Sequence, residues 1–207
     1  MARKRNTETE AKIAAAATTL FCDQGYVDTT MAAIAAEAGV AVQTLYLRHG
    51  SKAAVLSAAL DVAIAGDADP VELVDRSDDF YVRTMEEPDA RRAIAIWVHG
   101  ARSICDRSHR LYEVIRSASA DPDVAEVLEK NRTDRATGHR ALADALTTKQ
   151  GYDPDVSAQR AADLLYALGT EDAYLLFVVD RGWDVNEWER WVVETATAQI
   201  LLPRDHR

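Results

Sequence analysis

The stretch from Thr29 to Lys52, TTMAAIAAEAGVAVQTLYLRHGSK, contains two short helical patterns separated by a single glycine. The first, Met31–Ala38, is nearly all alanine, the best helix former, and a preceding threonine can cap its start. Gly39 suits the left-handed conformation that ends a helix, and the second pattern covers about Val42–Arg48. This arrangement is the plan of a helix-turn-helix motif, although an ordinary αα-hairpin has the same spacing.

The outward side chains of the second helix favour the helix-turn-helix interpretation. If Leu45 points into the core, then Val42, Gln43, Thr44 and Tyr46 lie at or near the outer face. A glutamine amide suits bidentate readout of adenine, and threonine and tyrosine hydroxyls suit phosphate oxygens. The stretch therefore predicts a DNA-binding helix.

Residues 5–60 resemble the DNA-binding region of the tetracycline-repressor-like (TetR) family of regulators. The family pattern is an apolar first helix ending in F-x-x-x-G-[YF], followed by T-T, I-A, a-G-V, T-L-Y and [SN]-K. The matching residues, in order and register, are Phe21, Gly25, Tyr26, Thr29, Thr30, Ile34, Ala35, Ala38, Gly39, Val40, Thr44, Leu45, Tyr46, Ser51 and Lys52.

The resemblance implies that the second helix enters a major groove while flanking residues hold the DNA backbone. The residues expected to contact DNA are Thr29, Thr30, Val42, Gln43, Thr44, Tyr46, Arg48 and Lys52. The chain departs from the family pattern at Ala41, where a capping Ser or Thr is usual, and at Arg48-His49, where His or Tyr and then Phe are usual. Losing that Phe should loosen the packing behind the helix, and these departures bear on the operator sequence more than on DNA binding.

The net charge of −10 is distributed unevenly along the 207 residues. Residues 1–52 hold six basic and five acidic side chains, and the remainder holds 18 basic and 29 acidic ones, densest over 67–89. This asymmetry predicts a DNA-facing head on an acidic body turned away from phosphate. With so small a positive excess, non-specific affinity for DNA should be weak.

Several features predict a cytoplasmic protein. No apolar run approaches the roughly 20 residues that span a bilayer, and no hydrophobic segment suited to a signal peptide follows the basic start MARKRN. Cys22 and Cys105 lie far apart and outside any metal-ligand spacing, so we expect reduced, unbridged thiols. No cofactor is expected.

The helical patterns predict an all-α fold of about nine helices. Residues 1–52 would form the DNA-binding domain, with a flexible basic arm before a capping box at Thr7–Glu10, and residues 53–207 a ligand-binding and dimerisation domain. Residues 70–87 suggest a short helix plus loop. The long helices expected in the body cover about 53–65, 88–105, 108–118, 121–146, 156–181 and 185–201.

The last two predicted helices carry more apolar surface than a monomer of this size would easily cover, which favours a dimer interface. In the resembled family they form a four-helix bundle with their symmetry mates. The residues expected at this interface are Leu164, Leu168, Leu175, Trp188, Val192 and Ala196. The alternative is a purely intramolecular core.

No sequence motif of a known catalytic centre is present, and we expect no enzyme. His99, Cys105 and His109 do not share a helix face, which argues against a metal site. Glu171 and Asp172 interrupt an apolar helix, and at least one of them should be solvated. The resemblance implies an inducer cavity, for which Trp97, Tyr112, Tyr166, Tyr174 and Phe177 are candidates, although aromatic residues at helical spacing are more often plain core.

The sequence therefore predicts a ligand-responsive transcriptional regulator, in the first instance a repressor, that binds a near-palindromic operator as a homodimer. Its expected partners are double-stranded DNA, a small-molecule inducer of unidentified chemistry and a second copy of itself, with no membrane. The alternative is a helical small-molecule-binding protein or enzyme with a vestigial DNA-binding head.

Overall fold

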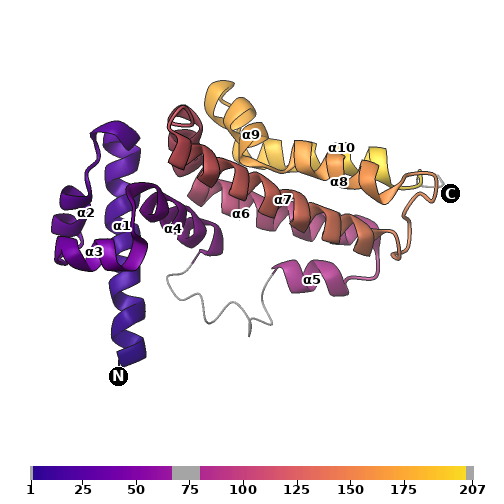
Figure 1. Ribbon diagram of the computed structural model, residues 1–207. Helices are drawn as coiled ribbons and strands as arrows, with labels where there is room; N and C mark the ends of the chain where they lie inside the picture. Colours follow the sequence, from indigo (N-terminus) through magenta and orange to yellow (C-terminus); the bar gives the residue numbers. More distant parts are fainter. Residues whose placement is uncertain (1, 67–79, 204–207) are drawn as a thin grey trace. The chain divides into compact units, whose positions relative to one another are not determined.

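The computed structural model describes residues 2–66 and 80–203, with side chains from residue 8 onward (Figure 1). The predicted all-α fold is confirmed, and within the described residues β-structure is limited to two isolated bridges. The same residues contain no helix long and apolar enough to cross a membrane. The helices are α1 (Ala2–Asp28), α2 (Met31–Glu37), α3 (Val42–His49), α4 (Lys52–Ala65), α5 (Phe80–Glu86), α6 (Ala90–Ser117), α7 (Pro122–Leu146), α8 (Ala158–Leu168), α9 (Glu171–Tyr174), a π-helix (Leu175–Asp180) and α10 (Val185–Ile200).

The chain forms two compact units, and the long helices α6 and α7 contribute to both. The first unit, the head, combines α1–α4 with residues 107–131, and the second, the body, combines α5 with residues 90–106 and 132–203. This division differs from the predicted boundary after residue 52, because α4 packs against α1 and α3. Most of the acidic stretch over 67–89 and most of the predicted element over 70–87 lie outside the described residues.

Helix α1 provides the central surface of the head and packs against both α2 and α4. Ile13, Ala17 and Phe21 recur at helical spacing and are buried, so they form the side of α1 that faces the core of the head. Gly25 interrupts the helical backbone with φ 76°, so the predicted stop is a kink before a final turn. The backbone is helical from Ala2, where a flexible arm was predicted. The predicted capping box cannot be followed further, because the Thr7 side chain is not among the described ones.

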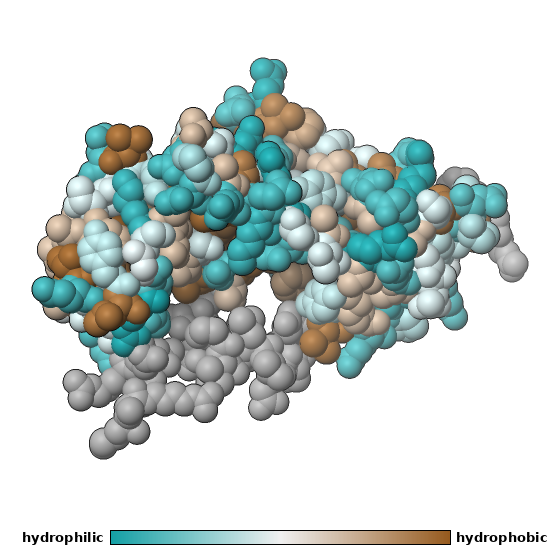
Figure 2. Space-filling model, viewed as in Figure 1, coloured by the Kyte–Doolittle hydropathy of each residue, from teal (hydrophilic) through white to brown (hydrophobic). Residues whose placement is uncertain are grey.

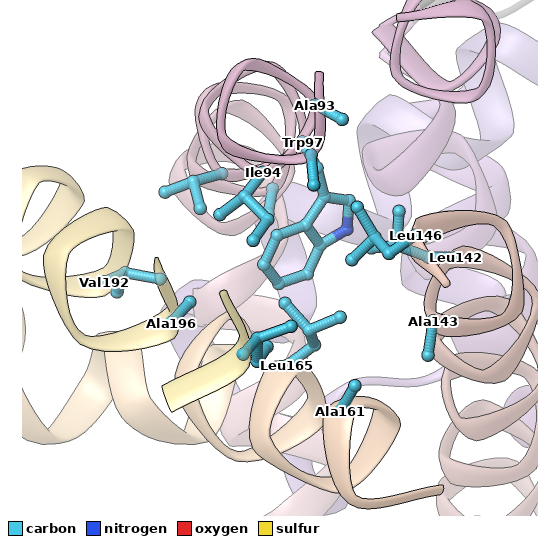
Figure 3. Packing of buried hydrophobic residues seen from close by; sticks show 14 of the residues in the cluster. Ala93, Ile94, Trp97, Leu142, Ala143, Leu146, Ala161, Leu165, Val192 and Ala196 are labelled. Atoms are coloured by element: carbon cyan, nitrogen blue, oxygen red, sulfur yellow. The ribbon is translucent and has the colours of Figure 1, made fainter. Parts of the chain in front are cut away.

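Trp97 on α6 lies at the centre of the body's hydrophobic core (Figure 3). Figure 3 shows Leu142 and Leu146 of α7 on one side of the indole and Leu165 of α8 below it. All three leucines are buried together with Trp97, which is 7% exposed. The core therefore joins three helices around one large side chain.

Two predicted helix boundaries in the body are wrong. The helices expected over 88–105 and 108–118 are one continuous helix, α6, because no helix-breaking residue separates them. The single helix expected over 156–181 is broken at Gly169 and Thr170. Gly169 lies against Trp97, and a Cβ built there would be 2.2 Å from the indole Cη2, so the break lets the backbone approach the core tryptophan.

Three of the residues predicted at a dimer interface lie inside the subunit instead. Trp188, Val192 and Ala196 on α10 are each 0% exposed and belong to the same core as Trp97. The intramolecular alternative is therefore correct for the inner stripe of α10. Leu175 is also buried, whereas Leu164 and Leu168 on α8 are half-buried.

The contact between Gly169 and Trp97 generates a first prediction. Gly169→Ala should lower the free energy of unfolding by about 1–3 kcal/mol, because the added methyl group overpacks the core. Gly138→Ala is the matched control, since a Cβ at this position in α7 meets nothing within 4 Å. The control should raise stability by about 0.5–1 kcal/mol through helix propensity. Chemical denaturation measures both, and equal effects of the two variants would contradict the overpacking.

Candidate functional site

The two helices of the predicted motif are held by local hydrogen bonds. The Thr30 hydroxyl accepts a hydrogen bond from the Ala33 backbone N–H at 3.1 Å and so caps α2. Gly39 adopts φ 67° in the turn, and the Val40 N–H donates to the Ala35 carbonyl at 2.9 Å. Ala41 occupies the N-cap position before helix α3 and provides no side-chain cap. The helix-turn-helix geometry is thus present, and the missing cap is confirmed.

Helix α3 has one buried residue, and its other side chains form the candidate interface. Leu45 is 0% exposed, as expected, and anchors the helix to the head. Val42 and Tyr46 are exposed large hydrophobic residues at 36% and 51%, and Gln43 is exposed beside them. The structure thus brings three of the predicted contact residues to one outer face, while Thr44 is half-buried at its edge.

Leu47 belongs to this face although the sequence patterns did not select it. It is 88% exposed, and it follows Gln43 by four residues, the spacing at which helical side chains are neighbours. The signal that could have found it is this i, i+4 relation to a predicted base-contacting residue. We refer to Val42, Gln43, Tyr46 and Leu47 as the reading face.

The Arg48 side chain points toward α1 and away from the reading face. Its guanidinium forms an ion pair with the Glu10 carboxylate. His49 Nε2 lies 3.1 Å from the other Glu10 oxygen, without the angles of a hydrogen bond. A polar anchor therefore holds the end of α3 where the family pattern has a buried aromatic residue.

Lys52 and Thr29 were both predicted to contact the DNA backbone. In the structure their side chains form hydrogen bonds with backbone carbonyls of the head. The Lys52 ammonium donates to the carbonyls of Tyr26, Thr29 and Val27 at 2.6, 2.9 and 3.4 Å, and it lies 4.1 Å from the Tyr26 ring centroid. Thr29 is 0% exposed, and its hydroxyl is 2.7 Å from the Gly25 carbonyl. These interactions fix the end of α1, and they give both side chains a structural role in the head.

The body carries an open groove of about 710 Å³ between α7 and α8. Its size falls within the range of ligand sites in proteins. Of the five aromatic residues predicted to line an inducer cavity, only Tyr166 lines this groove. The lining residues are Ala136, Thr137, His139, Arg140, Ala141, Asp144, Gln159, Ala162, Asp163 and Tyr166.

The other four aromatic candidates lie elsewhere. Trp97 is in the core and meets the His139 ring edge-on at 5.4 Å. Tyr112 is fully buried and belongs to the head. The Tyr174 hydroxyl donates to Asp106 at 2.5 Å, and burial, followed by that hydrogen bond, raises the pKa of Tyr174. Phe177 packs against Trp191 and Trp183, with ring centroids 4.6 and 4.8 Å away.

His139 is a buried polar residue of the groove that the sequence analysis did not suggest. Its Nδ1 lies 2.6 Å from the Arg135 carbonyl, and burial, followed by the charge of Arg135, lowers the pKa of His139, which keeps the ring neutral. Nδ1 is then the donor, and Nε2 is a buried acceptor without a hydrogen-bond partner among the described residues.

An ion pair stands beside His139. Arg135 Nη1 lies 2.6 Å from Glu171 Oε2, with the two side chains 11% and 3% exposed. The other terminal nitrogen of Arg135 donates to the Tyr166 hydroxyl at 3.3 Å. Asp172 Oδ2 also lies 3.5 Å from Arg135 Nη2, but its side chain is 45% exposed, which agrees with the expectation that at least one of the two acids is solvated.

Metal binding finds no support in the described residues. Within residues 2–66 and 80–203, no three His, Cys, Asp or Glu side chains are grouped to hold an ion. His99 Nδ1 lies 3.1 Å from Glu189 on the body surface, and Cys105 is buried.

Comparisons with known proteins bear on the head and on the fold. The family model described as "Bacterial regulatory proteins, tetR family" matches residues 13–59. A comparison with curated protein sequences gave no match.

The structure is similar to solved regulators along nearly its whole length. NalD, the secondary repressor of the MexAB-OprM multidrug efflux pump in Pseudomonas aeruginosa, is 18% identical with a TM-score of 0.69, covering 98% of this chain and 99% of that one. The fatty acid degradation regulator FadR from Bacillus halodurans is 16% identical with a TM-score of 0.71, covering 91% and 94%. A TetR transcriptional regulator from Chloroflexus aurantiacus is 18% identical with a TM-score of 0.66, covering 97% and 100%.

The uncapped start of α3 generates a second prediction. Ala41→Ser should raise the free energy of unfolding by about 0.5–2 kcal/mol, because the hydroxyl can accept one of the unpaired N–H groups of the first turn. Ala41 has extended dihedral angles, φ −70° and ψ 141°, which suit a capping residue. Thermal melting with chemical denaturation measures the change. Ala41→Val lacks the acceptor and should not stabilise, so a gain in both variants would argue against capping.

Proposed function

We propose that this chain, a transcriptional regulator with a tetR-family DNA-binding domain, is a ligand-responsive repressor that binds a near-palindromic operator as a homodimer. The observation that carries the proposal is the reading face of α3. It is exposed on a short helix that three features hold in place: the Gly39 turn, the buried Leu45 and the Glu10 anchor. A helix presented in this way fits a DNA major groove.

Reading two half-sites requires two heads at a fixed spacing. Recognition helices of a dimer enter successive major grooves about 34–36 Å apart, so a rigid connection between subunits is needed. Since the inner stripe of α10 is buried within the subunit, the dimer surface must use other residues. Leu176 and Val179 on the π-helix are 51% and 47% exposed and have the apolar character of an interface.

We place the second subunit against the surface formed by these two residues and by Leu164 and Leu168 on α8. The two α8 leucines are half-buried at the margin of the body core, so part of each side chain remains available to a partner. Burial of an exposed leucine contributes about 1.5–3 kcal/mol, and twofold symmetry doubles each contribution.

The groove between α7 and α8 is the proposed ligand site. It combines apolar lining from Ala136, Ala141 and Ala162 with polar groups that include the Tyr166 hydroxyl, the His139 ring and charged side chains. A ligand that binds there more tightly in one conformation of the dimer would shift the population toward it. The dimer would leave the DNA if, in the favoured conformation, the distance between the two recognition helices no longer matched that between successive major grooves. Because the proposed target is chromosomal DNA, the protein would act in the cytoplasm.

Substitutions on the reading face test DNA recognition. Gln43→Ala should weaken binding to the preferred site by about 1–3 kcal/mol and relax one base position, because the amide can bond two groups of an adenine. Tyr46→Phe removes one hydroxyl and should weaken binding to all sequences alike. Gel retardation at low salt on selected and unrelated duplexes separates the two effects. Wild-type affinity in both variants, with the heads folded, would rule out α3 as the reader.

The same experiment discriminates a second candidate function. A small-molecule-binding protein with a vestigial head would show a ligand-dependent thermal shift but no retardation of any duplex. The regulator should retard DNA, and a ligand of the groove should reduce that retardation. Footprinting on the DNA upstream of the coding region, with and without ligand, locates the operator.

The revised dimer surface generates a further prediction. Leu176→Glu should leave the subunit folded, because the side chain is already half exposed, and should weaken dimerisation about tenfold or more by placing a charge in an apolar interface. Val82→Glu on α5 is the control, since Val82 is 38% exposed outside the proposed surface. Sedimentation velocity measures both. An unchanged dimer in Leu176→Glu, or a monomeric wild type at micromolar concentration, would contradict the proposed interface.

A further inference from the structure

Leu47 is the most exposed of the large hydrophobic side chains identified at the surface of the described residues. At 88% exposure it contributes little to the packing of the head, yet it stands in the middle of a helix surrounded by the other reading-face residues. Figure 2 shows hydrophobic side chains as separate patches in the region of α2 and α3. A single exposed leucine is common at a protein surface, but on the helix proposed to face DNA its side chain is free to contact a base.

The charged groups near the reading face are already engaged. Helices α2 and α3 contain a single Arg or Lys, Arg48, and its guanidinium is paired with Glu10. The neighbouring Lys52 directs its ammonium to three backbone carbonyls of the head. A guanine presents the acceptors O6 and N7 in the major groove, and its commonest protein partner is an arginine or lysine. The reading face has no such cation to offer.

The remaining chemistry of the reading face matches the A·T base pair. A glutamine amide pairs with adenine N6 and N7, and an apolar side chain contacts the thymine C5-methyl group, which no other base of DNA carries in the major groove. Gln43 supplies the amide. Leu47 supplies the largest exposed apolar surface, one helical turn further on and about 6 Å along the helix axis, within reach of the same or a neighbouring base pair.

We propose that Leu47 reads a thymine methyl group and that each half-site of the operator carries A·T pairs under Gln43 and Leu47. This inference rests on the proposed function, because it specifies which DNA the reading face selects. The binding surface is apolar at Leu47 and polar at Gln43, so recognition depends on the methyl group itself and not only on the hydrogen-bonding edge of the base.

Uracil substitution tests the proposal directly, because deoxyuridine pairs like thymidine but lacks the methyl group. The full-length protein is first used to select its preferred duplex from a random library. Each thymine of that duplex is then replaced by deoxyuridine in turn, and Kd is measured by fluorescence anisotropy at fixed salt. One position in each half-site should raise Kd about fourfold, the value expected for one buried methyl group, and substitution in both half-sites about fifteenfold.

Variants assign the methyl contact to one side chain. Leu47→Asn should bind the thymine and uracil duplexes equally, whereas Leu47→Met keeps an apolar side chain and should retain the discrimination. Val27→Asn is the matched control: Val27 is 82% exposed in the head but lies outside α3, so this variant should discriminate as the wild type does. Circular dichroism melting verifies that each variant is folded, as the high exposure of both positions leads us to expect.

The outcomes separate this inference from the function on which it rests. Failure to bind any duplex would overturn both. Tight, selective binding that no uracil substitution weakens, a selected half-site with G·C pairs under α3, or full discrimination in Leu47→Asn would overturn the methyl contact alone and leave the DNA-binding function intact.

Discussion

A single ammonium group joins the end of α1 to the start of α4, the helix that follows the recognition helix. Lys52, the first residue of α4, donates to carbonyls at the end of α1 and in the link to α2. Those carbonyls follow the Gly25 kink and would otherwise lack partners, since the last carbonyls of a helix have no intrahelical donor. One side chain thus satisfies the end of α1 and fastens α4 to it. The requirement explains why Lys52 is structural although its position in the motif suggests a contact with DNA.

The charged side chains next to the reading face hold α3 and α4 in place, and none of them belongs to the reading face itself. Glu10 takes both Arg48 and His49, and this polar anchor replaces the aromatic residue that the family pattern places behind the helix. What remains outward on α3 is an amide, a phenol and two aliphatic side chains. Such a surface gains little from phosphate charge, in keeping with the small positive excess of residues 1–52, and must draw its affinity from shape and base contacts.

The body shows how one large side chain determines which surfaces are left for partners. Trp97 fills the space between α6, α7 and α8, and it lies against Gly169, at the break in the helix that the sequence predicts as continuous. The core draws the inner stripe of α10 into the subunit, whereas Leu176 and Val179 of the π-helix are about half exposed. His139 meets the edge of the same indole, so the wall of the proposed ligand groove rests on the core directly.

The sequence by itself determined the all-α class, the Gly39 turn, a threonine cap before α2, the uncapped Ala41 and the burial of Leu45, because each depends on a few neighbouring residues. It also predicted the reading face except for Leu47, and the DNA-binding role that the family match supports.

Only the tertiary structure decided what the long polar side chains reach and which apolar stripe faces the subunit's own core. An apolar stripe on a helix shows that it will be buried but not against what. Lys52 and Arg48 have partners 23–26 and 38 residues away in the chain, and Trp188 is buried against helices far from it in sequence. Distances of that kind are fixed by how helices pack, which no local pattern encodes.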